Sequence, residues 1–323
     1  MKTVLVTGGA GYIGSHACKA LAAAGYTPVA YDNLVYGHEW AVRWGPLEKG
    51  DILDPVRLSE LMKQYKPFAV MHFAAFAYVG ESVAEPAKYY RNNVTGTLTL
   101  LEAMRAHDVR NIVFSSSCAT YGIPDTVPIC EDAPQKPVSP YGASKLMSER
   151  ILADFGAAYG MKSVALRYFN AAGADPQGET GEDHDPETHL VPLVLDAAAG
   201  AHPHIMILGN DYDTPDGTCI RDYIHVTDLA SAHVLALQQL EKGTLNQAYN
   251  LGTGVGVSVL QVIEAARRVT SRDIPVVIGP RRPGDPAKLF AQAIRAQTDL
   301  GWRPRFSTIE EIIGTAWAWR QRR

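Results

Sequence analysis

The sequence has few cysteines, no surplus of basic residues and no long apolar run. Four of its 323 residues are cysteine (Cys18, Cys118, Cys130 and Cys219). None forms a CxxC pair, which argues against a disulfide framework or a cysteine zinc site. Thirty Lys and Arg against thirty-four Asp and Glu leave a net charge of -4, without the basic excess typical of nucleic-acid binding. We therefore expect a reducing, cytoplasmic location and a small-molecule partner, with no nucleic acid.

Membrane segments are missing as well. The apolar start of the chain is broken by Gly8, Gly9, Gly11 and Gly14, and no other stretch reaches the roughly 20 apolar residues of a membrane helix. We expect a soluble protein without a membrane partner. With 46% hydrophobic residues and a mean hydropathy of -0.09, the chain has ample core material for one large domain or two small ones.

Short apolar runs alternate with segments of helical periodicity through the first half. The expected strands are 3–7, 28–32, 69–73, 111–115 and 163–168, and the expected helices are 13–24, 56–64, 87–106 and 141–159. Strands that are apolar nearly throughout are typical of a parallel sheet covered by helices on both faces. The pattern predicts a doubly wound α/β domain, which binds ligands at the carboxyl ends of its strands.

The pattern changes after residue 170. Residues 171–186 are rich in Gly, Asp, Glu and Pro and are expected to form a long loop. Expected helices follow at 190–199, 226–240, 259–270 and 308–320, with expected strands at 247–251 and 274–278. We predict a first domain over 1–172 and a smaller mixed α/β subdomain over 173–323, with parts of 222–252 returning to the main sheet.

The chain begins with a strand, a glycine-rich turn and a helix, in the sequence VLVTGGAGYIGS at 4–15. Gly8 and Gly11 permit a tight turn and close approach of a pyrophosphate, and Gly14 lets the helix pack on the strand. The helix N-terminus at Tyr12 and Ile13 supplies amide donors to the phosphates. An ordinary strand–helix turn is the alternative, but the flanking strand and helix favour a Rossmann-type dinucleotide site.

Asp32 closes the second strand about 20 residues beyond the glycines, where a carboxylate accepts hydrogen bonds from the adenosine ribose. It would repel a 2′-phosphate, which favours NAD over NADP. Taken alone, an Asp that starts a turn before Asn33 is an equally good interpretation. Further cofactor contacts are expected at Asn33, Asp51, Ile52, Phe73, Ala74 and Ala75.

A second constellation combines Tyr141 and Lys145 with Ser117 from the end of the strand before them. Residues four apart share one helix face, with Cβ atoms roughly 5–6 Å apart. A free phenol has a pKa of about 10, and a neighbouring ammonium and the positive nicotinamide ring would lower it. Tyr141 would then take a proton from a sugar hydroxyl. By itself the pair is more typical of a packed Tyr beside a solvated Lys, and only its place after a dinucleotide turn and a strand-end serine favours catalysis.

Together these motifs resemble the extended short-chain dehydrogenases/reductases, and within them the NAD-dependent nucleotide-sugar epimerases of the UDP-glucose 4-epimerase family. The resemblance extends from residue 4 to about residue 319. It is carried by VTGGAGYIGSH at 6–16, SSSCATYG at 115–122, SPYGASK at 139–145, LRYFNAAGADP at 166–176, RDYIHVTDLA at 221–230, YNLGTG at 249–254 and RRPGDPA at 281–287.

The resemblance implies roles for individual residues. Tyr141 would be the base, Lys145 would bind the nicotinamide ribose, and Ser117 would contact the sugar hydroxyl. Further contacts with NAD are implied for Gly8, Gly11, Tyr12, Ile13, Gly14, Asp32, Phe73, Asn92, Ser115 and Tyr168, and contacts with the UDP-sugar for Asn170, Leu190, Arg221, Arg282, Asp285 and Leu289. Without the resemblance, the two arginines would be interpreted as surface residues. A homodimer formed by the helices at 87–106 and 141–159 is also implied.

The implied reaction inverts C4 of a UDP-hexose (UDP-glucose/UDP-galactose) through a 4-keto intermediate, with NAD tightly bound. No carboxylate follows Ser117, where relatives that dehydrate or decarboxylate a nucleotide sugar carry one. Leu289 is neither the bulky ring nor the small residue by which the family limits its sugar pocket, so UDP-xylose/UDP-arabinose and UDP-N-acetylhexosamines stay open. A net NAD(P)-dependent oxidoreductase and a non-catalytic NAD sensor are the competing functions.

Three positions depart from the best-known relatives. Ala77 replaces a lysine near the cofactor, and Thr188 and His189 replace an amide-bearing pair near the diphosphate. His189 and His184 also lie among five acidic residues between 179 and 187, a composition that superficially resembles a metal site. We interpret that segment as a solvated acidic loop, because nothing fixes its side chains on rigid elements, and expect no metal.

Overall fold

The computed structural model describes residues 1–243, 246–282 and 284–323. Its main sheet has seven parallel strands in the order β10-β6-β5-β4-β1-β2-β3. The strands are β1 (Thr3–Thr7), β2 (Thr27–Asp32), β3 (Leu47–Lys49), β4 (Ala69–His72), β5 (Asn111–Ser117), β6 (Lys162–Tyr168) and β10 (Gln247–Leu251). This arrangement confirms the predicted doubly wound sheet.

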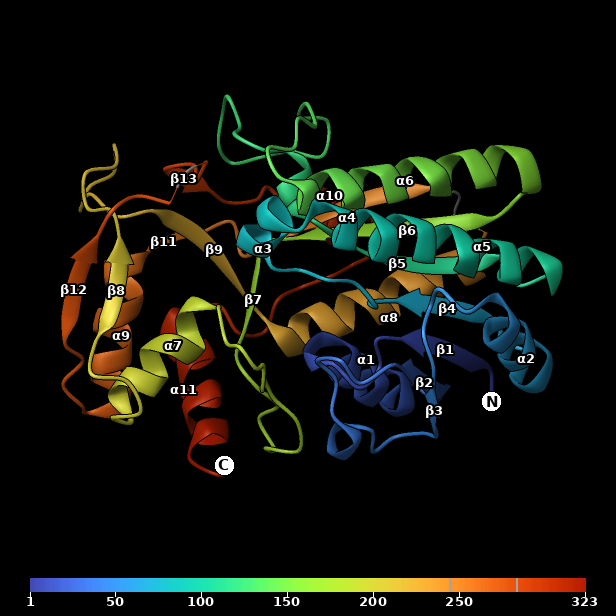
Figure 1. The fold of residues 1–323 in the computed structure, drawn as a ribbon, viewed down its shortest axis with the longest axis horizontal. Helices are drawn as coiled ribbons and strands as arrows, with labels where there is room; N and C mark the ends of the chain where they lie inside the picture. Colours follow the sequence, from blue (N-terminus) through green and yellow to red (C-terminus); the bar gives the residue numbers. More distant parts are fainter. Residues whose placement is uncertain (244–245, 283) are drawn as a thin grey trace.

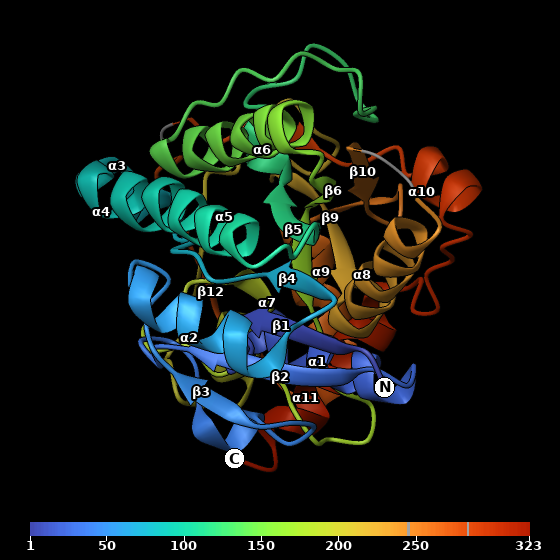
Figure 2. The same cartoon turned by 90° about the vertical axis from the view of Figure 1, so that its right-hand side faces the viewer.

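Helices cover both faces of the main sheet (Figure 2). One face packs against α1 (Tyr12–Ala23) and α8 (Val226–Glu241), and the other against α2 (Pro55–Tyr65), α5 (Gly96–Ala106) and α6 (Pro140–Tyr159). Alternate residues of β1 therefore enter two different cores. Val4 and Val6 pack in the first core, whereas Leu5 packs with Leu58 and Leu100 in the second. Burial on both faces explains why these strands are apolar at almost every position.

The second half of the chain adds a smaller mixed part, gathered at one end of the molecule in Figure 1. One sheet has β9 at its centre, paired with β7, β11 and β13, and a separate pair joins β8 to β12. The elements are β7 (Asn170–Ala172), β8 (Ile205–Leu208), β9 (Ile220–His225), β11 (Gly256–Ser258), β12 (Val276–Gly279), β13 (Lys288–Leu289), α7 (Leu190–Ala198), α9 (Val259–Thr270) and α11 (Ile309–Arg320). Its helices α7, α9 and α11 share one core. The short helix α10 (Ile294–Asp299) instead packs against β10 of the main sheet.

One expected helix differs from the structure. The helix expected over 87–106 is interrupted: α4 (Pro86–Tyr89) leads into a π-helical turn (Tyr90–Thr95) before α5 begins. Within 222–252, β10 and α8 join the main sheet, whereas β9 belongs to the smaller one. Strands of two to four residues, such as β13 and β8, are too short for a periodic pattern to reveal.

Two expectations from the sequence concern disulfide bonds and membrane-spanning helices. Cys18, Cys118, Cys130 and Cys219 are all free thiols. Among the described residues, no helix is both long enough and apolar enough to cross a membrane.

A buried ion pair joins α6 to β6. Arg167 is 6% exposed, and its Nη2 lies 2.6 Å from Oε2 of Glu149. We expect Arg167→Met to lower the free energy of unfolding by about 3–5 kcal/mol, because it leaves the Glu149 carboxylate uncompensated in the core. Arg150→Met is the control, since Arg150 forms an exposed pair with Asp154 and should not change stability measurably. Equal urea midpoints for the two variants would contradict this assignment.

Candidate active site

The glycine-rich turn between β1 and α1 is shaped for close approach of an anion. Gly8 has a φ of +74°, and a Cβ on Gly14 would lie 2.0 Å from the carbonyl oxygen of Gly8, so neither position accepts a side chain without strain. The N-cap of α1, Gly11, offers no side-chain cap, and the first turn at Tyr12 and Ile13 holds no acidic residue. Because first-turn amides lack intrahelical acceptors, they are available to phosphate oxygens.

Asp32 lies at the end of β2 and is 8% exposed. Its two carboxylate oxygens accept from the amides of Ala10 (3.0 Å) and Leu34 (2.8 Å). Burial raises the pKa of Asp32, although both hydrogen bonds act in the opposite direction. Each oxygen keeps a second lone pair, so Asp32 both ties the glycine turn to β2 and can accept from ribose hydroxyls.

Most of the other expected cofactor residues line the same edge of the sheet. Asn33 donates to the carboxylate of Asp51 over 2.9 Å, and the backbone of Ala74 faces Gly8. Phe73 and Ala74 both donate through their amides to the carbonyl of Thr7. Buried Ile52 follows Asp51, and Ala75 follows Ala74 beyond the end of β4. The structure therefore brings the carboxyl ends of β1, β2 and β4 together around the glycine turn.

Tyr141, Lys145 and Ser117 meet where α6 begins beside the end of β5. Ser139 caps α6 by accepting from the amide of Gly142, which places Tyr141 and Lys145 in its first two turns. Lys145 is 3% exposed, and its Nζ donates to the carbonyl of Ser115 over 2.8 Å. The same Nζ lies 6.0 Å from the centre of the Tyr141 ring. Ser117 acts on the Tyr141 hydroxyl by lowering its pKa.

The environment shifts the pKa values of this pair in opposite directions. Burial lowers the pKa of Lys145 to about 7, against the effect of Glu149. Burial also raises the pKa of Tyr141, Tyr168 adds to that rise, and the hydrogen bond from Ser117 opposes it. Both charged forms are thus disfavoured in the protein alone. A ligand that supplies hydroxyl acceptors for the ammonium and a positive ring beside the phenol would reverse both effects.

The residues around this pair fit a nicotinamide ribose. Among the described residues, Lys145 forms one hydrogen bond and so keeps two ammonium donors for a ligand. The hydroxyls of Ser115 and Tyr168 bond to each other at the ends of β5 and β6, and the Phe73 ring lies tilted against His233, with ring centres 4.6 Å apart. The donor-rich glycine turn, the Asp32 carboxylate and this lysine therefore have the chemistry that NAD requires.

Asn92 and Asn93 lie on the π-helical turn, a feature often found at functional sites. Asn92 is 9% exposed and donates to the side chain of Asn93 over 2.9 Å. Asn93 in turn bonds the backbone of Phe76 and the hydroxyl of Ser144. Sequence reasoning selected Asn92 and missed Asn93, which holds the loop after β4 against the helix that carries Tyr141. Only the repeated amide at 92–93 could have indicated it.

A second group of expected residues gathers around β9. Arg221 Nη2 and Arg282 Nε lie 3.6 and 3.9 Å from the two carboxylate oxygens of Asp285, and Leu289 on β13 pairs with Arg221. Asn170 on β7 donates to the carbonyl of Asp222 over 3.0 Å. Pro283, within the 281–287 motif, lies outside the described residues. Two arginines that share one carboxylate keep donors free for phosphate oxygens.

Cys118 connects this second group to Ser117, Tyr141 and Lys145. It directly follows Ser117 and lies in one hydrophobic cluster with Phe169 and Ala291, against which Leu289 packs. Asp222, which sequence reasoning missed, holds this region together. Its carboxylate accepts from the amides of residues 253, 254 and 291 at 2.8–3.1 Å. Because these partners are far from Asp222 in the sequence, no pattern near Asp222 could have predicted the contacts.

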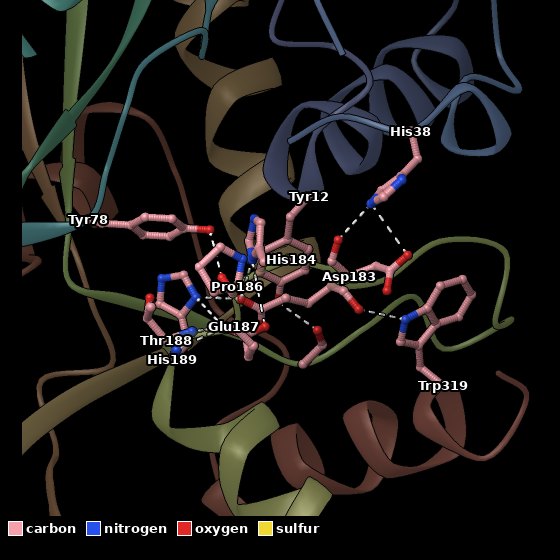
Figure 3. A network of polar contacts seen from close by, with 12 residues as sticks. Tyr12, His38, Tyr78, Asp183, His184, Pro186, Glu187, Thr188, His189 and Trp319 are labelled. Carbon is pink, nitrogen blue, oxygen red and sulfur yellow. Dashed lines mark hydrogen bonds and ion pairs between the residues drawn. The ribbon is translucent and has the colours of Figure 1, made fainter. Parts of the chain in front are cut away.

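The loop of 171–189 differs from the solvated segment expected. Glu182, Glu187 and His184 have side chains only 7%, 13% and 16% exposed, and they converge with His189 (Figure 3). His189 Nδ1 lies 2.8 Å from Glu182 and 3.0 Å from Glu187, and His184 Nδ1 lies 3.2 Å from Glu182. The loop is also anchored by Trp319, whose Nε1 donates to the carbonyl of Glu182. The sequence-based interpretation of this segment was therefore wrong about its burial.

The four side chains have the composition of a metal site, with one ligand atom each within 4.8 Å of one another. Their shortest separations, 2.8 and 3.0 Å, are hydrogen-bond lengths. Two carboxylates facing two imidazoliums also balance in charge. Burial alone would lower the pKa of both histidines, but Glu182 and Glu187 raise them, to about 9 for His184 and about 10 for His189. The cluster is thus accounted for by ion pairs, and the absence of a metal stays a prediction.

Comparison with known proteins places this geometry among nucleotide-sugar enzymes. Residues 4–252 match the NAD dependent epimerase/dehydratase family. The UDP-glucose 4-epimerase of Rhizobium meliloti (strain 1021) is 52% identical over 320 residues, 99% of this chain and 97% of that protein. The structure of UDP-glucose 4-epimerase from Brucella ovis with NAD is 56% identical, with a TM-score of 0.96 and 98% of both chains covered. That of Stenotrophomonas maltophila, with NAD and formylated UDP-arabinopyranose, is 41% identical, with a TM-score of 0.96 over 100% of this chain and 98% of that one.

Proposed function

Because the chain belongs to the NAD dependent epimerase/dehydratase family, we propose that it inverts C4 of a UDP-hexose and so interconverts UDP-glucose and UDP-galactose. The observation that carries this proposal is the buried Ser117–Tyr141–Lys145 group at the mouth of a dinucleotide fold. Relatives about half identical over nearly the whole chain are UDP-glucose 4-epimerases. No carboxylate stands after Ser117 to promote elimination.

In this mechanism Tyr141 takes the proton of the 4-hydroxyl and later returns it. NAD, held by the glycine turn, Asp32 and Lys145, would supply the hydride acceptor for C4 and, once reduced, the hydride donor to the opposite face of the 4-keto sugar. Ser117 hydrogen-bonds the same sugar oxygen and relays the proton. Lys145 binds the ribose through its free donors and favours the phenolate of Tyr141. The keto sugar turns about its diphosphate between the two halves.

The nucleotide would be held by the group around β9. Asn170, Arg221 and Arg282 are assigned to the diphosphate, because amide and guanidinium donors suit phosphate oxygens, and Asp285 is assigned to the uridine ribose. Leu190 opens α7 next to Asn170, so its amide is assigned to the same nucleotide. In this division residues 1–172 hold NAD and residues 173–323 hold the UDP-sugar, with two exceptions. Asn170 belongs to the diphosphate group, and α8 and β10 pack with the main sheet.

The sugar preference is tested by a substrate panel. We expect UDP-glucose and UDP-galactose to interconvert at least about tenfold faster than UDP-N-acetylglucosamine, because Leu289 is larger than the small residue that would make room for an acyl group. We expect the same advantage over UDP-xylose, because a pentose lacks the hydroxymethyl group that a hexose pocket would contact. NMR identifies each product. A UDP-pentose is the main alternative substrate, because a structurally similar epimerase was solved with formylated UDP-arabinopyranose. Faster turnover of UDP-xylose would replace the hexose assignment.

Tight retention of NAD distinguishes an epimerase from a net oxidoreductase, because the hydride must stay on the protein between the two halves. Purified protein should keep NAD through desalting and turn over without added reductant. Net accumulation of oxidised sugar with exchangeable cofactor would overturn the proposal. If the protein binds NAD but turns over none of the UDP-sugars, the result would support a non-catalytic NAD sensor instead.

We also assign a cytoplasmic location and a homodimer to the chain. Four free thiols are consistent with a reducing compartment. On the helices expected at the interface, Met147 is 46% exposed, whereas Leu101 is fully buried in the core. Leu98 is partly exposed. Sedimentation at micromolar concentration decides the oligomeric state.

A further inference from the structure

Glu149 lies one turn beyond Lys145 on α6, and its carboxylate is buried. Its side chain is only 9% exposed, although neither the cofactor nor the sugar assignments use it. Because residues four apart share one helix face, Tyr141, Lys145 and Glu149 form one row along α6. This helix packs against β5 and β6 (Figure 2). The row therefore places a buried carboxylate beside the two groups assigned to proton transfer.

Donors from several elements hold the Glu149 carboxylate in place. Arg167 on β6 donates from Nε to Oε1 over 2.9 Å and from Nη2 to Oε2 over 2.6 Å, and Gln135 donates to Oε2 over 3.4 Å. The third guanidinium nitrogen of Arg167, Nη1, donates to the hydroxyl of Tyr121 over 2.9 Å. A two-pronged contact between guanidinium and carboxylate has a defined geometry, so the charge of Glu149 stays at one place.

Glu149 also holds the end of β5 through Ser116. The hydroxyl of Ser116 donates to Oε1 of Glu149. The carbonyl of the residue before Ser116 accepts from Lys145 Nζ over 2.8 Å. The residue after it, Ser117, lowers the pKa of Tyr141. Glu149 is therefore linked to both reacting groups through three successive residues of one strand.

Glu149 is the charged group that acts on Lys145. Burial lowers the pKa of Lys145 to about 7, and Glu149 opposes that fall. His72 on β4 is neutral, because burial and Lys145 lower its pKa to about 3. Burial raises the pKa of the nearby phenols and thiol, which therefore carry no charge at neutral pH: Tyr89, Tyr168 and Cys118. Among the described residues, the charged groups on the elements packed against α6 do not contribute to the shift of Lys145: Glu81, Lys88, Arg91, Glu102, Arg105, Lys162 and Arg167.

Tyr141 and Lys145 titrate as a pair, so after losing its first proton the pair holds one proton between two sites. With that proton on Lys145, Tyr141 is the phenolate that the proposed reaction requires. With the proton on Tyr141, the pair offers no base to the sugar hydroxyl. A fixed negative charge near Lys145 favours the first of these two forms.

We propose that Glu149 is a positioning residue that keeps the shared proton of this pair on Lys145, with Arg167 and Ser116 fixing its carboxylate for that task. The inference rests on the proposed function and deepens it by naming the group that sets the protonation state of the base. Glu149 acts through Lys145, because its own carboxylate contacts protein donors and not the ligand.

The test follows the titration of Lys145 by NMR of 13C-labelled lysine in the NAD-loaded protein, with Lys145→Met to assign its signal. Glu149→Gln keeps an acceptor for Ser116 but removes the charge, so the titration midpoint of Lys145 should fall by about one pH unit. Arg167→Met breaks the same ion pair but keeps the carboxylate, and should not lower the midpoint. Asp154→Asn, at an exposed position of α6, is the matched control and should leave the midpoint unchanged. An unchanged midpoint in Glu149→Gln would overturn the proposal.

The pH dependence of kcat gives a second readout. At about pH 9 the pair shares one proton, so Glu149→Gln should lower kcat about 3–10-fold by moving that proton to Tyr141. At about pH 5 both groups are protonated in most molecules, so kcat should stay within about twofold of the wild type. A purely structural role for Glu149 would lower kcat by one factor at both pH values and contradict the inference.

Two further variants separate the charge from the hydrogen bond and from the fold. Ser116→Ala removes the hydrogen bond and keeps both charges, so Lys145 should titrate as in the wild type. A fall as large as that in Glu149→Gln would overturn the proposal. Because Glu149→Gln leaves Arg167 buried without its partner, Glu149→Gln combined with Arg167→Met removes both charges, an exchange that is often neutral for stability. The double variant should show the same low midpoint, and a wild-type midpoint would refute the inference.

Failure of this inference and failure of the epimerase activity give different results, because the titration of Lys145 requires no turnover. If the protein is inactive on every UDP-sugar but Glu149→Gln lowers the midpoint, the proposed function fails and the effect of Glu149 on Lys145 stands. If the protein is an active epimerase and the midpoint does not move, the inference fails alone.

Discussion

Tyr141→Phe is expected to lower kcat for UDP-galactose by about 1000-fold while leaving NAD bound. General-base catalysis contributes roughly 100- to 10,000-fold, and this contribution is lost when the phenol hydroxyl is removed. The phenyl ring fills the same space, and its edge contact with Tyr89 is kept. The loss should therefore fall on kcat with little change in KM.

The control for this experiment lies on the same helix. Tyr159 is 43% exposed at the last position of α6, and Tyr159→Phe removes an identical hydroxyl far from Ser117. Its kcat should equal that of the wild-type protein. NAD content, measured after denaturation, should match in all three proteins. A Tyr141→Phe variant that retains more than a tenth of wild-type activity would remove Tyr141 from the mechanism.

The features predicted correctly from the sequence are local in the chain. The glycine turn follows β1 within four residues, and Tyr141 and Lys145 are four residues apart on one helix, so backbone geometry alone brings their groups together. The doubly wound fold was predictable for a similar reason. Burial on both faces makes a parallel strand apolar throughout, and this pattern is visible in five residues of β1.

The features that sequence reasoning missed depend on contacts between distant segments. Asp222 bonds the backbone of residues 253 and 291, and nothing near Asp222 in the chain indicates those partners. The acidic loop was misinterpreted because burial of Glu182 depends on Trp319, more than a hundred residues away. A charged segment is usually solvated, and only tertiary packing reverses that expectation here.

Lys145→Met is expected to lower kcat about 100- to 1000-fold at pH 7. Burial already raises the pKa of Tyr141, and removing the neighbouring ammonium removes the charge that favours its phenolate. Each added pKa unit reduces the phenolate fraction tenfold. The remaining activity of the variant should therefore rise about tenfold per pH unit from pH 7 toward pH 10. Lys145→Arg keeps the positive charge, so its activity should rise less steeply with pH than that of Lys145→Met.

The same substitution should make folding more favourable, which separates lost chemistry from lost structure. Burial lowers the pKa of Lys145 to about 7, from its ordinary value of 10.5, so the folded state disfavours the proton that the unfolded chain holds. The resulting penalty is absent above pH 10.5, grows as pH falls and is complete below about pH 7. Chains stripped of NAD should thus resist urea better as Lys145→Met than as wild type at pH 7, with the difference vanishing near pH 11. A variant that is both inactive and less stable at pH 7 would mean that Lys145 supports the fold, and that Tyr141 obtains its basicity elsewhere.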